Sequence, residues 1–147
     1  MHFGPLTALT STDLDEIVKL QALLRNREVN RDDIELAVRM TLDSHTQKII
    51  TARDDNESIV AILIVNLLNK LEKIEARIDE VIVGESARGQ GVGRQLMEAA
   101  HQWAWDNNAD SIELTSRKSR EAANALYKKL GYELRNTNVY RLKKPSD

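Results

Sequence analysis

The stretch that decides the fold runs from Ile78 to Arg94 and reads Ile-Asp-Glu-Val-Ile-Val-Gly-Glu-Ser-Ala-Arg-Gly-Gln-Gly-Val-Gly-Arg. Its first part ends at Val83 in a β-branched run that is typical of a buried strand. Gly84 to Gly91 is polar and rich in glycine, and from Val92 onward the apolar residues follow a helical period. A strand therefore leads through a loop of accessible amides into a helix.

The start of this helix favours an anion. The first amides of a helix have no internal partner and lie at the positive end of its dipole, and glycines let an anion approach them closely. A dinucleotide fingerprint would need Gly or Ala where Arg94 stands, and a Walker loop would need Gly-Lys-Ser/Thr, which is missing. The residues predict a phosphate or pyrophosphate site, with a tight turn that binds no ligand as the alternative.

Two motifs carry a family resemblance. Arg88-Gly89-Gln90-Gly91-Val92-Gly93 resembles the Arg/Gln-x-x-Gly-x-Gly/Ala signature of the GNAT acyl-CoA acetyltransferase superfamily. Ala123-x-x-Leu126-Tyr127-x-x-x-Gly131-Tyr132 is similar to the Ala-x-x-Leu/Phe-Tyr-x-x-x-Gly-Phe/Tyr element of that family. With the elements between them, the motifs cover roughly the C-terminal half of the chain. The resemblance implies that the loop amides hold the pyrophosphate of acetyl-CoA.

The order of predicted elements also matches the family. A first strand lies within residues 2–9, and Thr12 is expected to cap a helix that has Asp13, Asp15 and Glu16 in its first turn. The other elements expected from apolar periodicity are a helix over 32–43, strands over 47–53, 58–67 and 76–83, a helix over 92–107, a strand over 111–115, a helix over 120–130 that Gly131 ends, and a hairpin of 132–134 with 139–142. We therefore expect the GNAT acyl-CoA N-acyltransferase fold, an α/β protein of the α+β type. Its central mixed sheet would be mostly antiparallel, splayed at the cofactor site and flanked by about four helices, in a single domain over residues 1–147.

Composition narrows the possible partners. The 147 residues carry a formal net charge of −2, which implies no general attraction to nucleic acid or to an anionic membrane. The chain has no cysteine and three scattered histidines, so a disulfide framework, a thiolate nucleophile and a metal site are not expected. The longest apolar run, Ile59 to Val65, is too short to span a bilayer, and no signal peptide is seen. We expect a cytoplasmic protein, and a homodimer is possible because many relatives pair.

Two residues are expected to move protons. In GNAT enzymes the tyrosine at the position of Tyr127 protonates the departing thiolate of CoA; the alternative is a core tyrosine. Acetyl transfer to an amine also needs a proton acceptor, because an alkylammonium has a pKa of about 10. Many members of the family place a carboxylate where Glu80 stands. Asp79 or water remains an alternative base, because a bulge, which members of the family commonly have at this point, would change which side chain faces the site.

The resemblance also implies a set of cofactor contacts. Amides of the strand before the loop would hold the pantetheine arm and the thioester oxygen, and Arg120 stands where many members have an Asn that contacts this arm. Arg117 and Lys118 stand nearby in the sequence, and two alternatives stay open for them: contact with the 3′-phosphate, or solvated side chains with no ligand. The cofactor-binding residues predicted in this way are Val81, Ile82, Val83, Arg88, Gly89, Gln90, Gly91, Val92, Gly93, Arg94, Arg120, Asn124 and Tyr127.

These features together predict an acetyl-CoA-dependent N-acetyltransferase. It would move the acetyl group to a primary amine of a small molecule by direct transfer in a ternary complex. Two alternatives stay open at this point: acetylation of a protein N-terminus or lysine, and a non-catalytic acyl-CoA-binding domain on the same fold. The segments expected to flank the acceptor site, Leu24 to Arg31 and Asn69 to Glu75, are mixed in charge and do not choose between a small amine and a peptide.

Overall fold

The computed structural model describes residues 1–146, and the chain divides between Thr115 and Ser116 into two compact units. The first unit contains a five-stranded sheet in which sequential strands are neighbours, in the order β1-β2-β3-β4-β5. Its strands are β1 (His2–Pro5), β2 (Gln47–Arg53), β3 (Ile59–Asn69), β4 (Ile74–Val83) and β5 (Ser111–Glu113). The first four run antiparallel to one another, and β5 runs parallel to β4. The expected mixed, mostly antiparallel sheet is confirmed.

The sheet opens between β4 and β5. These strands pair only from Glu75, opposite Ser111, to Arg77, opposite Glu113. Beyond Arg77, β4 continues to Val83 with no further paired residue on its β5 side in the part of the chain that the structure describes. The free edge of β4 therefore leads directly into the glycine loop.

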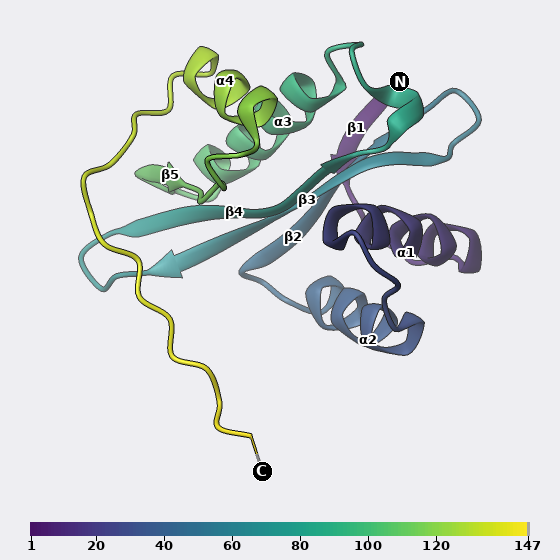
Figure 1. Ribbon diagram of the computed structural model, residues 1–147, viewed down its shortest axis with the longest axis horizontal. Coiled ribbons are helices and arrows are strands. Elements are labelled where there is room, and N and C mark those ends of the chain that lie inside the picture. The colour runs from purple at the N-terminus through teal and green to yellow at the C-terminus, as the bar shows by residue number, and fades with distance from the viewer. Residues whose placement is uncertain (147) are drawn as a thin grey trace. The chain divides into compact units, whose positions relative to one another are not determined.

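Helices cover both faces of this sheet. Helices α1 (Ser11–Arg25) and α2 (Arg31–Leu42) lie on one face, and α3 (Val92–Asp106) lies on the other (Figure 1). On α3, Leu96 and Met97 are fully buried, which explains why β3 is apolar on both faces. None of the helices within residues 1–146 is long and apolar enough to cross a bilayer. The buried residues of the α1–α2 side form one cluster: Leu6, Ile17, Leu20, Val38, Ile49, Ile59, Ile62 and Ile82.

Helix α1 begins earlier than expected. Its cap is Thr10, not Thr12, because Thr10 Oγ1 accepts the Asp13 N–H at 3.0 Å and Asp13 Oδ2 accepts the Thr10 N–H at 3.1 Å. The two bonds form a reciprocal capping box, in which the side chain of an acidic residue at the third helical position accepts the backbone N–H of the cap residue. The prediction that Thr12 caps the helix is therefore wrong by two residues.

The second unit consists of α4 (Glu121–Lys129) and the segment after it. The helix ends at Gly131, which has a φ of +94°, and the Tyr132 N–H donates to the Tyr127 carbonyl at 3.0 Å. This is a Schellman ending, so the expected role of Gly131 is confirmed. The predicted hairpin of 132–134 with 139–142 is wrong: residues 132–146 contain no strand. Leu134 and Leu142 are 96% and 98% exposed, so they have no packing surface of the kind that stabilises a strand.

Candidate active site

The loop after β4 is shaped by glycines. A short 3₁₀ turn, η1 (Glu85–Ala87), follows β4, and Gly91 is the N-cap of α3. Gly89 and Gly91 have φ angles of +73° and +75°, and a residue with a side chain would lose about 1–2 kcal/mol in this conformation. The loop can take this course because both positions lack a side chain.

The first turn of α3 offers amide donors. The Gln95 N–H donates to the Gly91 carbonyl at 3.2 Å and closes the first helical turn. The amides of Val92, Gly93 and Arg94 precede this bond and so have no partner within the helix. They lie at the positive end of the dipole of a 15-residue helix. This arrangement fits an anionic ligand such as a diphosphate.

Side chains of the loop brace its backbone. Arg88 Nε donates to the Val83 carbonyl at 3.2 Å, and Gln90 Nε2 donates to the Ser86 carbonyl at 2.9 Å. Arg94 Nε pairs with Glu98 Oε1 at 3.0 Å along the helix. Arg88, Gln90 and Arg94 are all exposed, so their remaining N–H groups face solvent beside the amides of the loop.

At the end of β4, the backbone groups of one residue face the edge of the strand that is not paired with β5. The Gly84 N–H donates to the Val60 carbonyl of β3 at 2.8 Å. Because successive residues of a strand point their backbone groups to opposite edges, Val83 faces away from β3 and Ile82 faces β3. The Ile82 side chain also lies in the core, at 6% exposure. Of the strand amides implied by the resemblance, that of Val83 is therefore the one placed to meet an extended ligand.

A bulge in β4 places Glu80. Ile82 pairs with Ile62 and Asp79 pairs with Ile64, so Glu80 and Val81 together lie opposite the single residue between these partners. Glu80 has a φ of +57°, a left-handed conformation that is uncommon for a residue with a side chain. Strain of this kind costs about 1–3 kcal/mol and is concentrated at functional sites. The bulge is the irregularity that the resemblance led us to expect.

The structure separates the two candidate bases. Asp79 uses both oxygens: Oδ1 meets Arg77 Nε at 3.2 Å, and Oδ2 meets Asn66 Nδ2 at 3.2 Å. Glu80 Oε1 accepts from Arg25 Nη2 at 2.7 Å, whereas the structure shows no hydrogen-bond partner within residues 1–146 for the buried Glu80 Oε2. An unsatisfied buried acceptor is costly, so Oε2 is the carboxylate atom best placed to receive a proton or a donor.

Arg25 was not among the residues predicted for the site. It is the last residue of α1 and lies 55 positions before Glu80 in the chain. The sequence placed Arg25 only within the segment from Leu24 to Arg31 that was expected to flank the acceptor. No local pattern could have paired an arginine with a carboxylate at that distance.

The second unit holds the remaining predicted residues. Tyr127 is the buried residue of α4, whereas the apolar residues Ala123, Leu126 and Leu130 are only half-buried. Its ring meets that of Tyr132 edge to face, with 5.9 Å between the centroids. Burial raises the pKa of the Tyr127 hydroxyl above the usual 10.0, and the nearby charge of Arg120 acts in the opposite direction. The phenol therefore keeps its proton at neutral pH.

The spacing i, i+4, i+7 of Arg120, Asn124 and Tyr127 predicts that they share one face of a helix, and this face is only partly formed. Arg120 is the N-cap residue and precedes the helix, and the amide of Asn124 donates to the Arg117 carbonyl at 2.9 Å. Within the second unit, Arg120 lies near enough to Tyr127 to act on its hydroxyl. The glycine loop, Glu80 and the end of β4 belong to the first unit, so their approach to Tyr127 stays a prediction.

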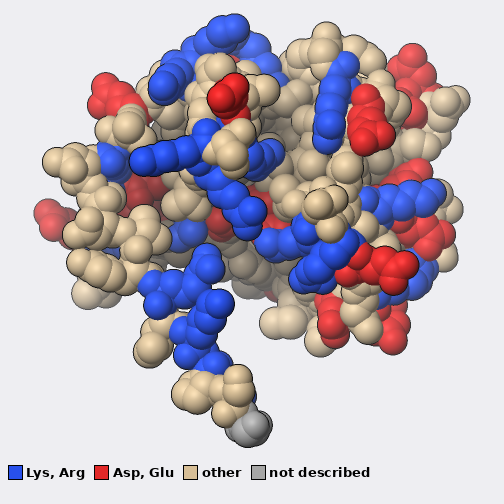
Figure 2. All heavy atoms as spheres, in the orientation of Figure 1, with Lys and Arg blue, Asp and Glu red and all other residues tan. Residues whose placement is uncertain are grey.

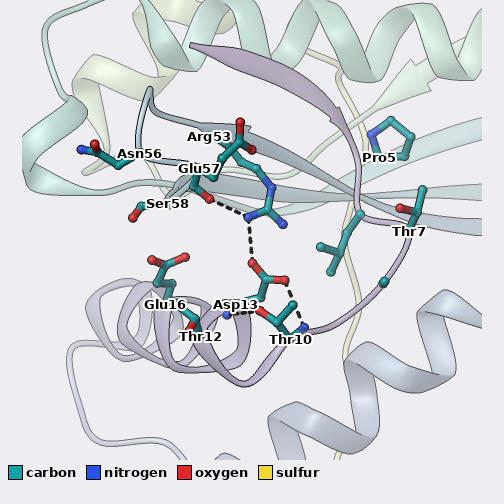
Figure 3. A pocket seen from close by; sticks show the side chains of 12 residues that line it. Pro5, Thr7, Thr10, Thr12, Asp13, Glu16, Arg53, Asn56, Glu57 and Ser58 are labelled. Atoms are coloured by element: carbon teal, nitrogen blue, oxygen red, sulfur yellow. Dashed lines mark hydrogen bonds and ion pairs between the residues drawn. The ribbon is translucent and has the colours of Figure 1, made fainter.

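A separate hollow of about 470 Å³ lies between the start of α1 and the β2–β3 hairpin (Figure 3). Arg53 donates to Asp13 Oδ1 at 2.7 Å and to the Glu57 carbonyl at 2.8 Å, and Glu16 Oε2 accepts the Ile59 N–H at 2.8 Å. The polar groups that line this hollow thus link α1 to the β2–β3 hairpin. Among residues 1–146, no three His, Asp or Glu side chains gather in a way that could hold a metal ion.

The family follows from a comparison with known proteins. Residues 14–132 match the Acetyltransferase (GNAT) family, a stretch that contains the glycine loop, Glu80 and Tyr127. The chain belongs to the GNAT acetyltransferase family.

Individual proteins are similar to this chain in sequence or in fold. An uncharacterized N-acetyltransferase of Bacillus subtilis (strain 168), YobR, is 30% identical over 90 residues, which are 61% of this chain and 35% of that protein. The chain thus matches about a third of the length of this curated relative. A crystal structure of a transcriptional regulator from Bacillus halodurans C-125 is 27% identical with a TM-score of 0.82, covering 97% of this chain and 100% of that one. An aminoglycoside 6′-N-acetyltransferase from Acinetobacter haemolyticus shares the fold, with a TM-score of 0.75 at 18% identity over 99% of this chain and 100% of that one.

Proposed function

We propose that the protein is an acetyl-CoA-dependent N-acetyltransferase that acetylates a primary amine of a small molecule by direct transfer in a ternary complex. The observation that carries the proposal is the start of α3, where left-handed glycines and first-turn amides without helical partners adjoin the free edge of β4. The family match begins in the first unit and ends in the second, so we propose that both units work as one domain over residues 1–147.

The residues present fit the diphosphate and the arm of acetyl-CoA. Amides from Gly89 to Arg94 would hold the pyrophosphate, and the backbone of Val83 would hold the arm. Arg120 and Asn124 are proposed to border the same ligand from the second unit. When bound, acetyl-CoA supplies the acyl carbon that an amine attacks, so that a C–N bond forms while the C–S bond breaks.

Two side chains would handle the protons. Glu80 Oε2 accepts a proton from the acceptor ammonium, directly or through water, because Oε1 is the only oxygen of this carboxylate with a hydrogen-bond partner within residues 1–146. The Tyr127 hydroxyl holds the proton that the departing sulfur needs, and its raised pKa keeps that proton in place at neutral pH. Asp79 is the less suitable base, since both of its oxygens already accept hydrogen bonds.

Two measurements test the function. Calorimetry with coenzyme A and acetyl-CoA should show saturable binding, and thiol release should appear when amines are added with acetyl-CoA. The amine panel should include peptides with a free N-terminus or a lysine, which separates a small acceptor from a protein acceptor. Binding without turnover on any amine would favour a non-catalytic acyl-CoA-binding protein. No uptake of either coenzyme form would overturn the proposal.

A further inference from the structure

The pair formed by Arg25 and Glu80 has a feature that a purely structural ion pair lacks. Arg25 Nη2 lies 2.7 Å from Glu80 Oε1, and the two side chains are 47% and 23% exposed. Among the residues that the structure describes, only one oxygen of the Glu80 carboxylate has a hydrogen-bond partner, although buried polar atoms are normally satisfied. Glu80 also has the left-handed backbone of the bulge. An unsatisfied buried oxygen on a strained residue indicates a site for a ligand.

The charges of this pair restrict the ligand. Arg25 and Glu80 together carry no net charge, so a ligand with only positive charges would be attracted by Glu80 and repelled by Arg25. Arg25 is half-exposed and has further N–H groups besides the one bonded to Glu80. Those donors suit a carboxylate, which a guanidinium binds with short, charge-assisted hydrogen bonds.

We propose that Arg25 and Glu80 together bind an acceptor of the amino-acid class, in which a carboxylate lies close to the amine that is acetylated. Glu80 Oε2 takes the N–H of the amine, and the remaining donors of Arg25 take the carboxylate. Arg25 thereby determines specificity and also holds the Glu80 carboxylate in place. The inference rests on the proposed function and names the substrate class for the same site.

The test compares acceptors that have a carboxylate with acceptors that lack one. Thiol release is measured with amino acids, their methyl esters, the corresponding decarboxylated amines and a polyamine. We expect kcat/KM for the best amino acid to exceed that for its ester and its decarboxylated amine by about ten-fold or more, since a charge-assisted hydrogen bond is worth roughly this factor. Equal or better turnover of the ester or the polyamine would overturn the inference.

Variants assign the preference to Arg25. Arg25→Gln should remove most of the preference by raising KM for the amino acid, with a smaller effect on the ester, and Arg25→Lys should retain part of it. The control is Arg39→Gln, because Arg39 of α2 also forms a 2.7 Å pair with a carboxylate, that of Glu35, and its side chain is likewise exposed, at 58%. It should leave the preference unchanged. An equal loss of both acceptors in Arg25→Gln, or an equal effect of the two substitutions, would contradict the role of Arg25.

A binding measurement separates the two possible failures. Calorimetry of the preferred amino acid with the enzyme and coenzyme A should show weaker binding to Arg25→Gln than to Arg39→Gln. If acetyl-CoA is turned over with other amines but not preferentially with amino acids, only the substrate class is wrong. If no amine supports turnover, the proposed function fails and this inference fails with it. Melting curves of each variant confirm that it is folded before kinetics are compared.

Discussion

Gly91 is the residue whose replacement tests the loop most directly. Its φ of +75° suits glycine, and an added Cβ would meet nothing within 4 Å, so Gly91→Ala changes conformational strain without a clash. We expect about 1 kcal/mol lower stability and weaker binding of coenzyme A, measured by urea unfolding and calorimetry. The control is Gly4→Ala, which also meets open space but at a position without a positive φ. Unchanged coenzyme binding in Gly91→Ala would argue against the anion site.

Tyr127 tests proton donation to sulfur. Tyr127→Phe should slow turnover by roughly ten- to ten-thousand-fold with little change in acetyl-CoA binding. Because burial raises the pKa of Tyr127 above 10.0, the hydroxyl is protonated over the neutral range and loses its proton only at higher pH. The wild-type rate should therefore fall on the alkaline side, and Tyr127→Phe should lack that fall. A variant with wild-type turnover would remove Tyr127 from the mechanism.

At the scale of elements, the bulge of β4 lowers the stability of the fold and at the same time places the Glu80 carboxylate. Glu80→Gly should relieve the left-handed strain, which is worth about 1 kcal/mol, while it loses a partly exposed ion pair worth at most about the same. We expect stability that is unchanged or slightly higher and turnover that is lower by about a hundred-fold or more. Urea unfolding and thiol release measure the two quantities.

Glu80→Gln is the matched control for that experiment. It keeps the side chain and the φ of +57°, so it keeps the strain but loses the basic oxygen. It should lose turnover without any gain in stability. If Glu80→Gly were the less stable of the two variants, the strain argument would be wrong.

The capping box of α1 gives a prediction about acid stability. Burial alone would raise the pKa of Asp13, but hydrogen bonds from Arg53 and Thr10 and the charge of Arg53 lower it below 3.8. The ionised Asp13 carboxylate therefore contributes its full stabilisation of the folded state above pH 3.8, the pKa in the unfolded chain. This contribution is lost as the pH falls through the lower pKa that Asp13 has in the folded state.

The matched variants are Asp13→Asn and Asp15→Asn. Asp13→Asn should lower the free energy of unfolding by about 1–3 kcal/mol at neutral pH, because the Asp13 carboxylate accepts hydrogen bonds from the cap residue Thr10 and from Arg53. The difference from wild type should shrink in acid. Asp15 is 57% exposed in its pair with Arg31, so Asp15→Asn should cost less than about 1 kcal/mol. Urea unfolding at several pH values compares them, and equal costs would contradict the role given to Asp13.

At the scale of the whole molecule, the segment after α4 bears on assembly. Basic side chains lie along this segment, whereas acidic and basic side chains are mixed over much of the face shown (Figure 2). It also displays four large apolar side chains at 77–98% exposure: Leu134, Val139, Tyr140 and Leu142. Several large exposed apolar side chains in one short segment are candidates for an interaction surface. They support the expectation of a homodimer.

Light scattering after gel filtration tests this expectation. The wild-type chain should run as a dimer, and the pair Leu134→Ser and Leu142→Ser should shift it toward the monomer. Leu71→Ser is the control, since Leu71 is equally exposed, at 97%, but is isolated in the β3–β4 turn. A monomeric wild type at all concentrations, or an equal shift in the control, would count against dimerisation through this segment.

The motifs allowed much of the fold to be predicted. The strand, glycine loop and helix around Gly89 and Gly91 are placed as expected, and so are the ending of α4 at Gly131 and the bounds of β2. The misses are the cap of α1, set by bonds between Thr10 and Asp13, and the final hairpin. A strand requires a partner to pair with, and residues 132–146 form no strand in the structure.

The sequence by itself determined the features that depend on neighbouring residues: where the chain turns, where helices begin and end, and which segments are buried. Tertiary structure decided that Glu80 keeps one oxygen unpartnered and that Arg25, 55 positions away, holds the other. The register of β3 against β4 also decided that Glu80 sits in a bulge. Local preferences arise within a few residues, whereas contacts between distant side chains exist only after strands and helices have packed.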